Sequence, residues 1–213
     1  ARVIVNDLDQ EPADEVIAQI QAMGGEATAC VGNVAAADFG ERCVKTALDT
    51  FGRIDIIVNN AGFTWDNVIQ KMSDEQWDAI VDCHLKAPFL LLRAAYPYFR
   101  EASKAEAETG QEVFRKVVNI SSVSGTQGNA GQINYSAAKA GIIGMTKTLC
   151  KEWGRMKVNV NCVAFGAIET RLTQATTEEK TVQVEGRDIK AGVHPGRIAA
   201  AGRDTPLGRF GTV

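Results

Sequence analysis

The amino-acid sequence predicts an α/β fold, a doubly wound parallel sheet in three layers with helices on both faces. Two observations predict it. Short runs of β-branched and other apolar residues alternate with longer segments of helical periodicity along the chain. The short runs are apolar almost throughout, which is typical of parallel strands that are buried on both faces. With 213 residues, the chain has the length of one domain, so we expect residues 1–213 to share a single core.

The first predicted strand is RVIVN at 2–6, and Pro12 opens a helix that Gly24 and Gly25 end. Ser73 is an expected N-cap because Gln76, three residues later, completes a capping box. Further strands are expected at 26–31, 54–58, 116–120 and 158–163, and further helices at 39–51, from Ser73 to about residue 100, and at 135–154. A Gly-rich loop is expected after residue 122, and a hairpin that turns at Gly186 and Arg187 is expected near the end.

Composition argues against several kinds of partner. The formal net charge is -3 and the pI is near 5.5, so no basic stripe for nucleic acid is expected. No run of eighteen apolar residues is present, and we expect neither a membrane span nor a secretory signal. The five cysteines are scattered without a CxxC pair, which is typical of reduced thiols in a cytoplasmic protein. No metal-binding pattern is predicted.

Candidate binding residues gather at the ends of predicted strands. In open parallel sheets, ligands bind beyond the carboxyl ends of the strands. The residues in such positions are Asp7, Asn33, Val34, Asn60, Ala61, Gly62, Ser122, Ile168 and Thr170. Their shared position predicts one ligand site along that edge.

A catalytic group is predicted around Tyr135. Lys139 follows it by one helical turn, so the phenol and the ammonium share a helix face. Ser122 ends the preceding strand and can complete a triangle with them. A lysine beside a phenol lowers the pKa of the phenol, which suits it to proton transfer near neutral pH.

These residues resemble the Ser-Tyr-x-x-x-Lys centre of the short-chain dehydrogenase/reductase family, and Asn59-Asn60-Ala61-Gly62 resembles its NNAG motif. The segment GTQGNAGQINYSAAKAGIIGMTKTL is similar in sequence to the corresponding segment of 3-oxoacyl-[acyl-carrier-protein] reductases. The resemblance implies a Rossmann-type sheet and a cofactor that delivers hydride to a carbonyl carbon. Tyr135 would give the proton, Ser122 would hold the oxygen, and Lys139 would lower the pKa of Tyr135 and bind the nicotinamide ribose.

The resemblance also assigns the binding residues. Asp7 would accept hydrogen bonds from ribose hydroxyls and repel a 2′-phosphate, which predicts NAD in preference to NADP. Asn33 and Val34 would pack on the adenine, and Ile168 and Thr170 would contact the nicotinamide half. A 3-oxoacyl thioester is the predicted substrate. The alternatives are another hydroxy compound, such as a steroid or polyol, and a non-catalytic homologue that acts as a binding subunit. A homotetramer built on the helices at 74–100 and 135–154 is implied.

Several departures from the family pattern stand out. The first strand with its glycine-rich TGxxxGxG loop and the last helix-strand unit are absent from this sequence, so we expect the domain to be incomplete at both ends. His84 stands where the family has an asparagine, and Phe165 where it has a proline. His84 either holds the water that links Lys139 to solvent or is a packing histidine. Residues 101–112 are expected to be a solvated helix extension, and 172–205 a long substrate lid.

Overall fold

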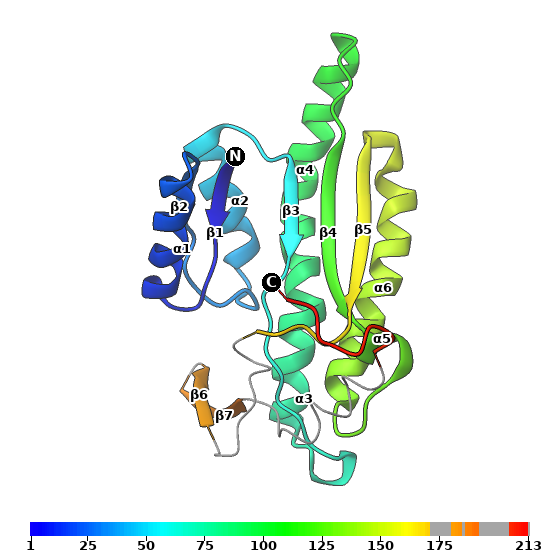
Figure 1. Ribbon diagram of the computed structural model, residues 1–213. Helices are drawn as coiled ribbons and strands as arrows, with labels where there is room; N and C mark the ends of the chain where they lie inside the picture. The colour runs from blue at the N-terminus through cyan, green and yellow to red at the C-terminus, as the bar shows by residue number, and fades with distance from the viewer. Residues whose placement is uncertain (171–179, 185, 192–204, 213) are drawn as a thin grey trace.

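The computed structural model describes residues 1–170, 180–184, 186–191 and 205–212. Strands and helices alternate through most of the described chain (Figure 1). The strands are β1 (Arg2–Val5), β2 (Glu26–Ala29), β3 (Ile56–Asn59), β4 (Arg115–Ser122), β5 (Val158–Phe165), β6 (Lys180–Val184) and β7 (Arg187–Ala191). The α-helices are α1 (Gln10–Ala22), α2 (Phe39–Phe51), α3 (Asp74–Val81), α4 (Ala87–Glu108), α5 (Val123–Gln127) and α6 (Ile133–Trp153), and two 3₁₀ turns span Ile69–Lys71 and Gly154–Met156.

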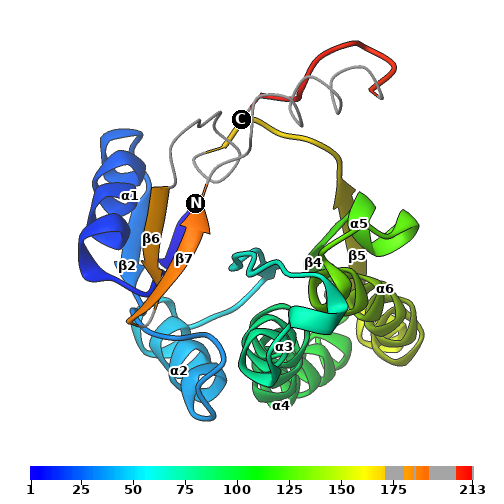
Figure 2. The same ribbon diagram turned by 90° about the horizontal axis from the view of Figure 1, so that it is seen from below.

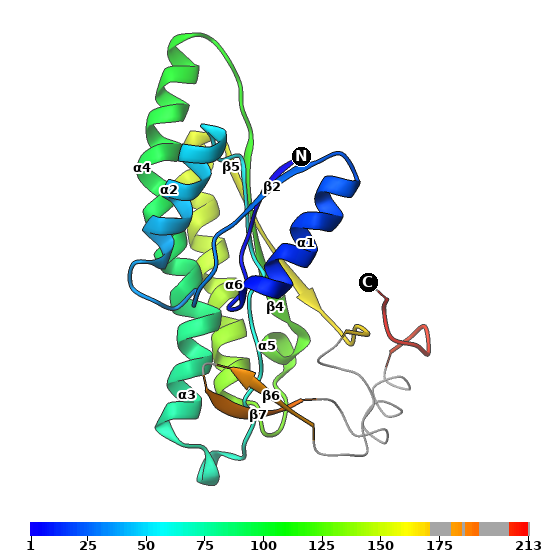
Figure 3. The same ribbon diagram turned by 90° about the vertical axis from the view of Figure 1, so that its left-hand side faces the viewer.

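The predicted parallel pairing is confirmed. β1 pairs with β2, and β4 lies between β3 and β5, all in parallel. The β4–β5 ladder runs from Arg115 opposite Val158 to Ser122 opposite Phe165. Seen from below and from the side, α2, α4 and α6 lie on one face of the strands and α1 on the other (Figures 2 and 3). The carboxyl ends of all five parallel strands therefore point to one edge, where the candidate residues lie.

The predicted boundaries need two corrections. The long helix after Ser73 is interrupted: a π-helical turn at Asp82–Lys86 separates α3 from α4. The Gly-rich loop after β4 begins with the short helix α5, because the Ser122 side chain accepts a hydrogen bond from the Ser124 N–H and caps it. The capping box between Ser73 and Gln76 is present as predicted, with both reciprocal hydrogen bonds formed.

The main core lies between the β3–β4–β5 sheet and the helices on one face. Its central side chains include Val117 of β4, Phe99 of α4 and Trp153 at the end of α6. The rings of Phe99 and Trp153 meet edge to face with centroids 5.8 Å apart. This packing fixes α4 and α6 side by side behind the strands that carry the candidate site.

The two parallel sheets are not joined to each other by ladder hydrogen bonds within the described residues. β1 and β3 each present an unpaired edge, and the resemblance places the first strand of the family between them. On β3, Ile57 is buried, whereas its neighbours Ile56 and Val58 are 62% and 55% exposed. One face of β3 is therefore uncovered in the described structure.

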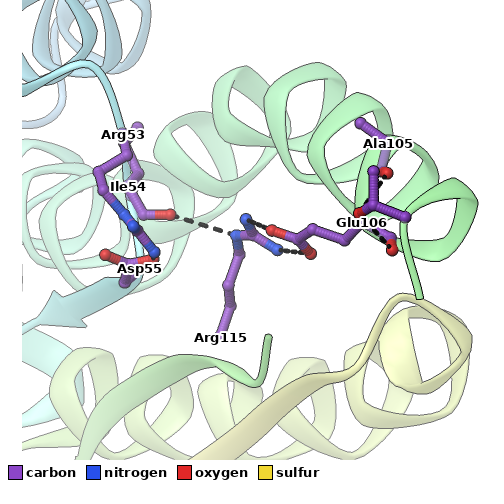
Figure 4. Close-up of polar contacts among 7 residues, drawn as sticks. Arg53, Ile54, Asp55, Ala105, Glu106 and Arg115 are labelled. Atoms are coloured by element: carbon purple, nitrogen blue, oxygen red, sulfur yellow. Dashed lines mark hydrogen bonds and ion pairs between the residues drawn. The ribbon is translucent and has the colours of Figure 1, made fainter. Parts of the chain in front are cut away.

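The far end of α4 is the predicted helix extension and is mostly exposed, but one of its residues, Glu106, attaches it to the sheet by an ion pair. Arg115 is 2% exposed, and its two terminal nitrogens donate to the Glu106 carboxylate at 2.9 and 2.6 Å (Figure 4). Its Nε donates to the Ile54 carbonyl at 3.3 Å, and its guanidinium lies over the rings of Tyr98 and Phe99. This bidentate pair lowers the pKa of the Glu106 carboxyl, mainly through its hydrogen bonds to Arg115.

Candidate active site

Ser122 and Tyr135 meet as the sequence predicts. Ser122 is the last residue of β4, and its side chain lies close enough to Tyr135, on the first turn of α6, to lower the pKa of the phenol. The Ser122 oxygen also accepts the Ser124 N–H at 3.1 Å. Because this N–H occupies one side of the oxygen, the hydroxyl proton of Ser122 is directed away from it and can be donated to an oxygen.

Lys139 lies beside Tyr135 but its amine points elsewhere. The Lys139 Nζ is 5.5 Å from the centroid of the Tyr135 ring and donates to the Ile120 carbonyl at 2.6 Å. The side chain is only 4% exposed, and this burial lowers the pKa of Lys139 to about 8. The amine therefore gains and loses a proton close to neutral pH.

The expected lowering of the Tyr135 pKa is wrong for this structure. Burial raises the pKa of Tyr135, and the carboxylate of Asp66 raises it further, while the Ser122 hydrogen bond lowers it only in part. No interaction with Lys139 contributes to that shift. Tyr135 is consequently protonated at neutral pH, which is the form that donates a proton.

His84 lies against Tyr135 in the π-helical turn. The two rings meet edge to face at 5.0 Å, and the His84 Nε2 is 2.6 Å from the Phe63 carbonyl oxygen. A carbonyl only accepts, so Nε2 carries the proton and Nδ1 is the bare acceptor. This Nδ1 is buried and has no hydrogen-bond partner among the residues that the structure describes.

The charge state of His84 follows from its surroundings. Burial, and then the nearby Lys139, lower its pKa to about 3, against a smaller opposing effect of the Phe63 carbonyl. Lys139 therefore contributes to the low pKa of His84, although burial is the larger cause. His84 is consequently neutral near neutral pH.

The NNAG segment packs against the same histidine. A Cβ placed on Gly62 would lie 2.2 Å from the His84 Cε1, so a side chain at this position requires the ring to move. Asn60, Ala61 and Gly62 themselves are exposed at the end of β3. This leaves their backbone open to a ligand, as the motif predicts.

The predicted adenine side of the site also comes together. The carboxyl ends of β1 and β2 are joined by the Gly32 N–H, which donates to the Asp7 carbonyl at 2.9 Å. The Asp7 side chain accepts the Asp9 N–H at 3.3 Å, and the Asn33 side chain accepts the Ala35 N–H at 2.7 Å. Asp7, Asn33 and Val34 thus occupy one corner of the strand edge.

Ile168 and Thr170 lie in the segment after β5. Ile168 forms an isolated parallel β-bridge with Gly211. Phe165 ends β5 opposite Ser122 and is 44% exposed. Of the predicted lid, residues 172–179, 185 and 192–204 lie outside the described residues, and the predicted hairpin is present as β6 and β7.

The role of Asn134, the residue before Tyr135, is not predicted from the sequence. The Asn134 side chain is fully buried and donates to the carbonyls of Trp65 and Gln76 at 3.2 and 3.0 Å, while its oxygen accepts the Tyr135 N–H. It ties α6 to the segment that holds Trp65 and Asp66. These contacts join residues far apart in the chain, and the only local signal is that Asn134 directly precedes Tyr135.

The site as a whole offers a proton donor, a second hydroxyl and a buried amine beside an open strand edge. Within the described residues, no group of three or more potential metal-ligand side chains is found, and none of the described helices has the length and apolar character needed to cross a bilayer. The exposed backbone at Gly62 and the carboxylate of Asp7 fit a dinucleotide laid along the edge. The geometry suits proton transfer to an oxygen held by Ser122 and Tyr135.

Comparison with known proteins decides the family. A family model described as short chain dehydrogenase matches residues 1–181. The chain belongs to the short-chain dehydrogenase family. It is therefore an oxidoreductase of a family whose members use a nicotinamide cofactor.

Individual members of the short-chain dehydrogenase family show how far the likeness extends. The chain is 43% identical over 183 residues to a 3-oxoacyl-[acyl-carrier-protein] reductase of Synechocystis, covering 85% of this chain and 70% of that protein. It is 36% identical over 211 residues to a reductase of the same name from Thermotoga maritima, covering 99% and 75%. A crystal structure of a short chain dehydrogenase from Mycobacterium avium superposes with a TM-score of 0.71 at 40% identity, covering 78% of this chain and 61% of that one.

Proposed function

We propose that this protein reduces the 3-keto group of an acyl thioester to a secondary alcohol with a reduced nicotinamide cofactor. The single observation that carries the proposal is the placement of the Ser122 hydroxyl beside the Tyr135 phenol, whose pKa is raised mainly by burial so that the phenol keeps its proton at neutral pH. A ketone oxygen placed between two such hydroxyls receives one hydrogen bond from each. The similarity to 3-oxoacyl-[acyl-carrier-protein] reductases supports a thioester as the substrate.

In the proposed reaction the cofactor supplies the hydride. Tyr135 donates its phenolic proton to the substrate oxygen as negative charge develops there, and Ser122 orients that oxygen with its hydroxyl proton. Lys139, with its pKa near 8, is suited to return a proton to Tyr135 after each turnover. Neutral His84 holds the Phe63 carbonyl and so keeps the cofactor-facing segment against α6.

The surface beside Tyr135 suits an apolar acyl chain. Asn67 donates its N–H to the Gly131 carbonyl at 2.9 Å, so the segments on either side of that contact run together next to α6. They expose Val68, Ile69 and Ile133 by 43%, 69% and 41%. Contiguous exposed apolar side chains beside a reactive centre favour an apolar substrate over a polyol.

We further propose a preference for NAD(H), because the Asp7 carboxylate lies at the end of β1 where it would repel a 2′-phosphate. Arg42 is the cation in this corner, where a Cβ placed on Gly32 would lie 2.8 Å from its Nη2; its guanidinium donates to the Val31 carbonyl at 2.7 Å and lies over the Phe39 ring, and its charge opposes the effect of Asp7 on a 2′-phosphate. Arg2, at the opposite end of β1, lies over the Phe51 ring.

We also propose a homotetramer whose interface uses the groove of about 580 Å³ between α4 and α6, lined by Phe89, Tyr96, Met145 and Leu149 among others.

The test is a panel of cofactors and carbonyl substrates with the full-length protein, followed by the absorbance of the reduced nicotinamide. We expect oxidation of NADH with 3-oxoacyl thioesters, and a lower kcat/KM with NADPH. Asp7→Ser should raise the NADPH/NADH ratio of kcat/KM. Loss of cofactor oxidation with every thioester would refute the proposed substrate, and an unchanged ratio would refute the role of Asp7. Light scattering on the same sample measures the oligomeric state, and a monomer would contradict the tetramer.

A further inference from the structure

The β6–β7 hairpin is held against the active-site side of the molecule by its second strand. It is an antiparallel pair of five residues a side that turns at Gly186, whose φ of +75° suits glycine. Figures 1 and 3 show it beside α3. Ile189 of β7 is only 3% exposed, so the face of this strand that carries it is covered rather than open to solvent.

One residue of the hairpin joins it to two separate elements. The Arg187 Nε donates to a carboxylate oxygen of Glu75 at 2.8 Å, and the Arg187 guanidinium carbon lies 5.8 Å from the centre of the Trp65 ring. Glu75 is in the first turn of α3, and Trp65 is in the segment between β3 and α3. The contacts are complementary, since the charge of one guanidinium meets a carboxylate and its flat face meets an aromatic ring.

The residues that Arg187 contacts are connected to Tyr135 through the hydrogen bonds of Asn134. The Trp65 carbonyl accepts a hydrogen bond from the Asn134 side chain, and Asn134 in turn accepts the N–H of Tyr135. Asn134 also donates to the carbonyl of Gln76, the residue after Glu75. Arg187 therefore attaches the hairpin to Trp65 and Glu75, which are part of, or next to, the residues that hold Asn134 and so position Tyr135.

We propose that Arg187 is a positioning residue that anchors the β6–β7 hairpin as a fixed wall of the substrate entrance beside Tyr135. The inference rests on the proposed function for the nature of the substrate, whereas the anchoring itself rests only on the contacts above. A wall at this place acts on the part of the substrate that extends away from the carbonyl. Anchoring therefore sets the KM of long-chain substrates and leaves the chemical step to Ser122, Tyr135 and Lys139.

The first test measures anchoring without activity. Thermolysin cleaves a segment in proportion to the time that it spends undocked, when docking is fast. Loss of an exposed ion pair and of a ring contact in Arg187→Gln should speed hairpin cleavage roughly 3- to 30-fold. Glu75→Gln should speed it less, and the double variant should be no faster than Arg187→Gln, because both changes remove the same ion pair. Arg209→Gln, at an exposed arginine that donates to the Phe210 carbonyl, is the matched control.

The second test measures the substrate wall in the same proteins. For a twelve-carbon 3-oxoacyl thioester, Arg187→Gln should raise KM by a similar factor with kcat unchanged, and for the four-carbon thioester KM should move little. If Arg187→Gln is cleaved faster but neither KM changes, the hairpin is not a wall of the substrate entrance. If Arg187→Gln is cleaved at the wild-type rate, or if the effects of the two single changes multiply in the double variant, Arg187 does not anchor the hairpin through Glu75. If the wild type reduces no thioester, the proposed function fails, while the thermolysin rates still decide the anchor.

Discussion

At the scale of single residues, the burial of His84 makes the free energy of unfolding depend on pH. The native protein keeps the ring neutral down to a pKa of about 3, whereas an unfolded histidine binds a proton below about pH 6.5. Between these two values the unfolded state holds more protons, so stability falls as the pH falls. The slope is about 1.4 kcal/mol per pH unit.

We therefore predict that the free energy of unfolding drops by about 2 kcal/mol more in wild type than in His84→Asn between pH 7 and pH 5. Asparagine does not titrate, and the loss of the Nε2 contact with the Phe63 carbonyl lowers stability at both pH values, so the pH-dependent part of the difference reports on the imidazole. Urea unfolding at the two pH values measures the difference, with His194→Asn as the control for the chain's other histidine. Equal losses in wild type and His84→Asn would show that His84 is not buried neutral.

The catalytic residues differ in how well the sequence reveals them. Ser122, Tyr135 and Lys139 are predictable because a strand end and one helical turn place them together whatever the rest of the fold does. The direction of the Tyr135 pKa is not predictable in this way. It depends on burial and on Asp66, and the spacing of Tyr135 and Lys139 carries no information about either.

At the scale of elements, the far end of α4 illustrates the same limit. Its Ala-, Glu- and Lys-rich sequence is typical of a solvated helix, and nothing local distinguishes Glu106 from its neighbours. The buried Arg115 at the start of β4 selects it through two hydrogen bonds (Figure 4). Helix periodicity predicts that α4 exists, whereas only the tertiary packing of β4 decides which glutamate is attached.

We predict that Glu106→Gln lowers the free energy of unfolding by about 2–4 kcal/mol, because it leaves a buried guanidinium without its anionic partner. Glu101→Gln is the matched control: its ion pair with Arg100 is exposed on both sides, and its loss should cost no more than about 0.5 kcal/mol. Urea unfolding of the two variants provides the comparison. Similar small effects would mean that Arg115 is not dependent on Glu106.

At the scale of the whole molecule, the strand order places the predicted site residues that follow a strand, such as Asp7, Asn60 and Ser122, at the carboxyl edge of the sheets. Alternating apolar runs and helical segments are enough to predict this parallel architecture, since each crossover returns the chain to the same direction. The π-helical turn that aims His84 at Tyr135 and the anchored β6–β7 hairpin are not predictable, because both depend on contacts between distant segments. The exposed Ile56 and Val58 also emerge only from the assembled sheets.

The central claim is that Tyr135 gives the proton that completes ketone reduction, and the most direct measurement is the kcat of Tyr135→Phe for a 3-oxoacyl thioester with NADH. The substitution removes one oxygen and leaves the ring against His84, so the fold and cofactor affinity should persist. We predict a kcat about 10²–10⁴-fold below wild type, with the kcat of Tyr98→Phe, whose ring lies by Arg115 away from the site, unchanged. A kcat for Tyr135→Phe within a few-fold of wild type would contradict the account.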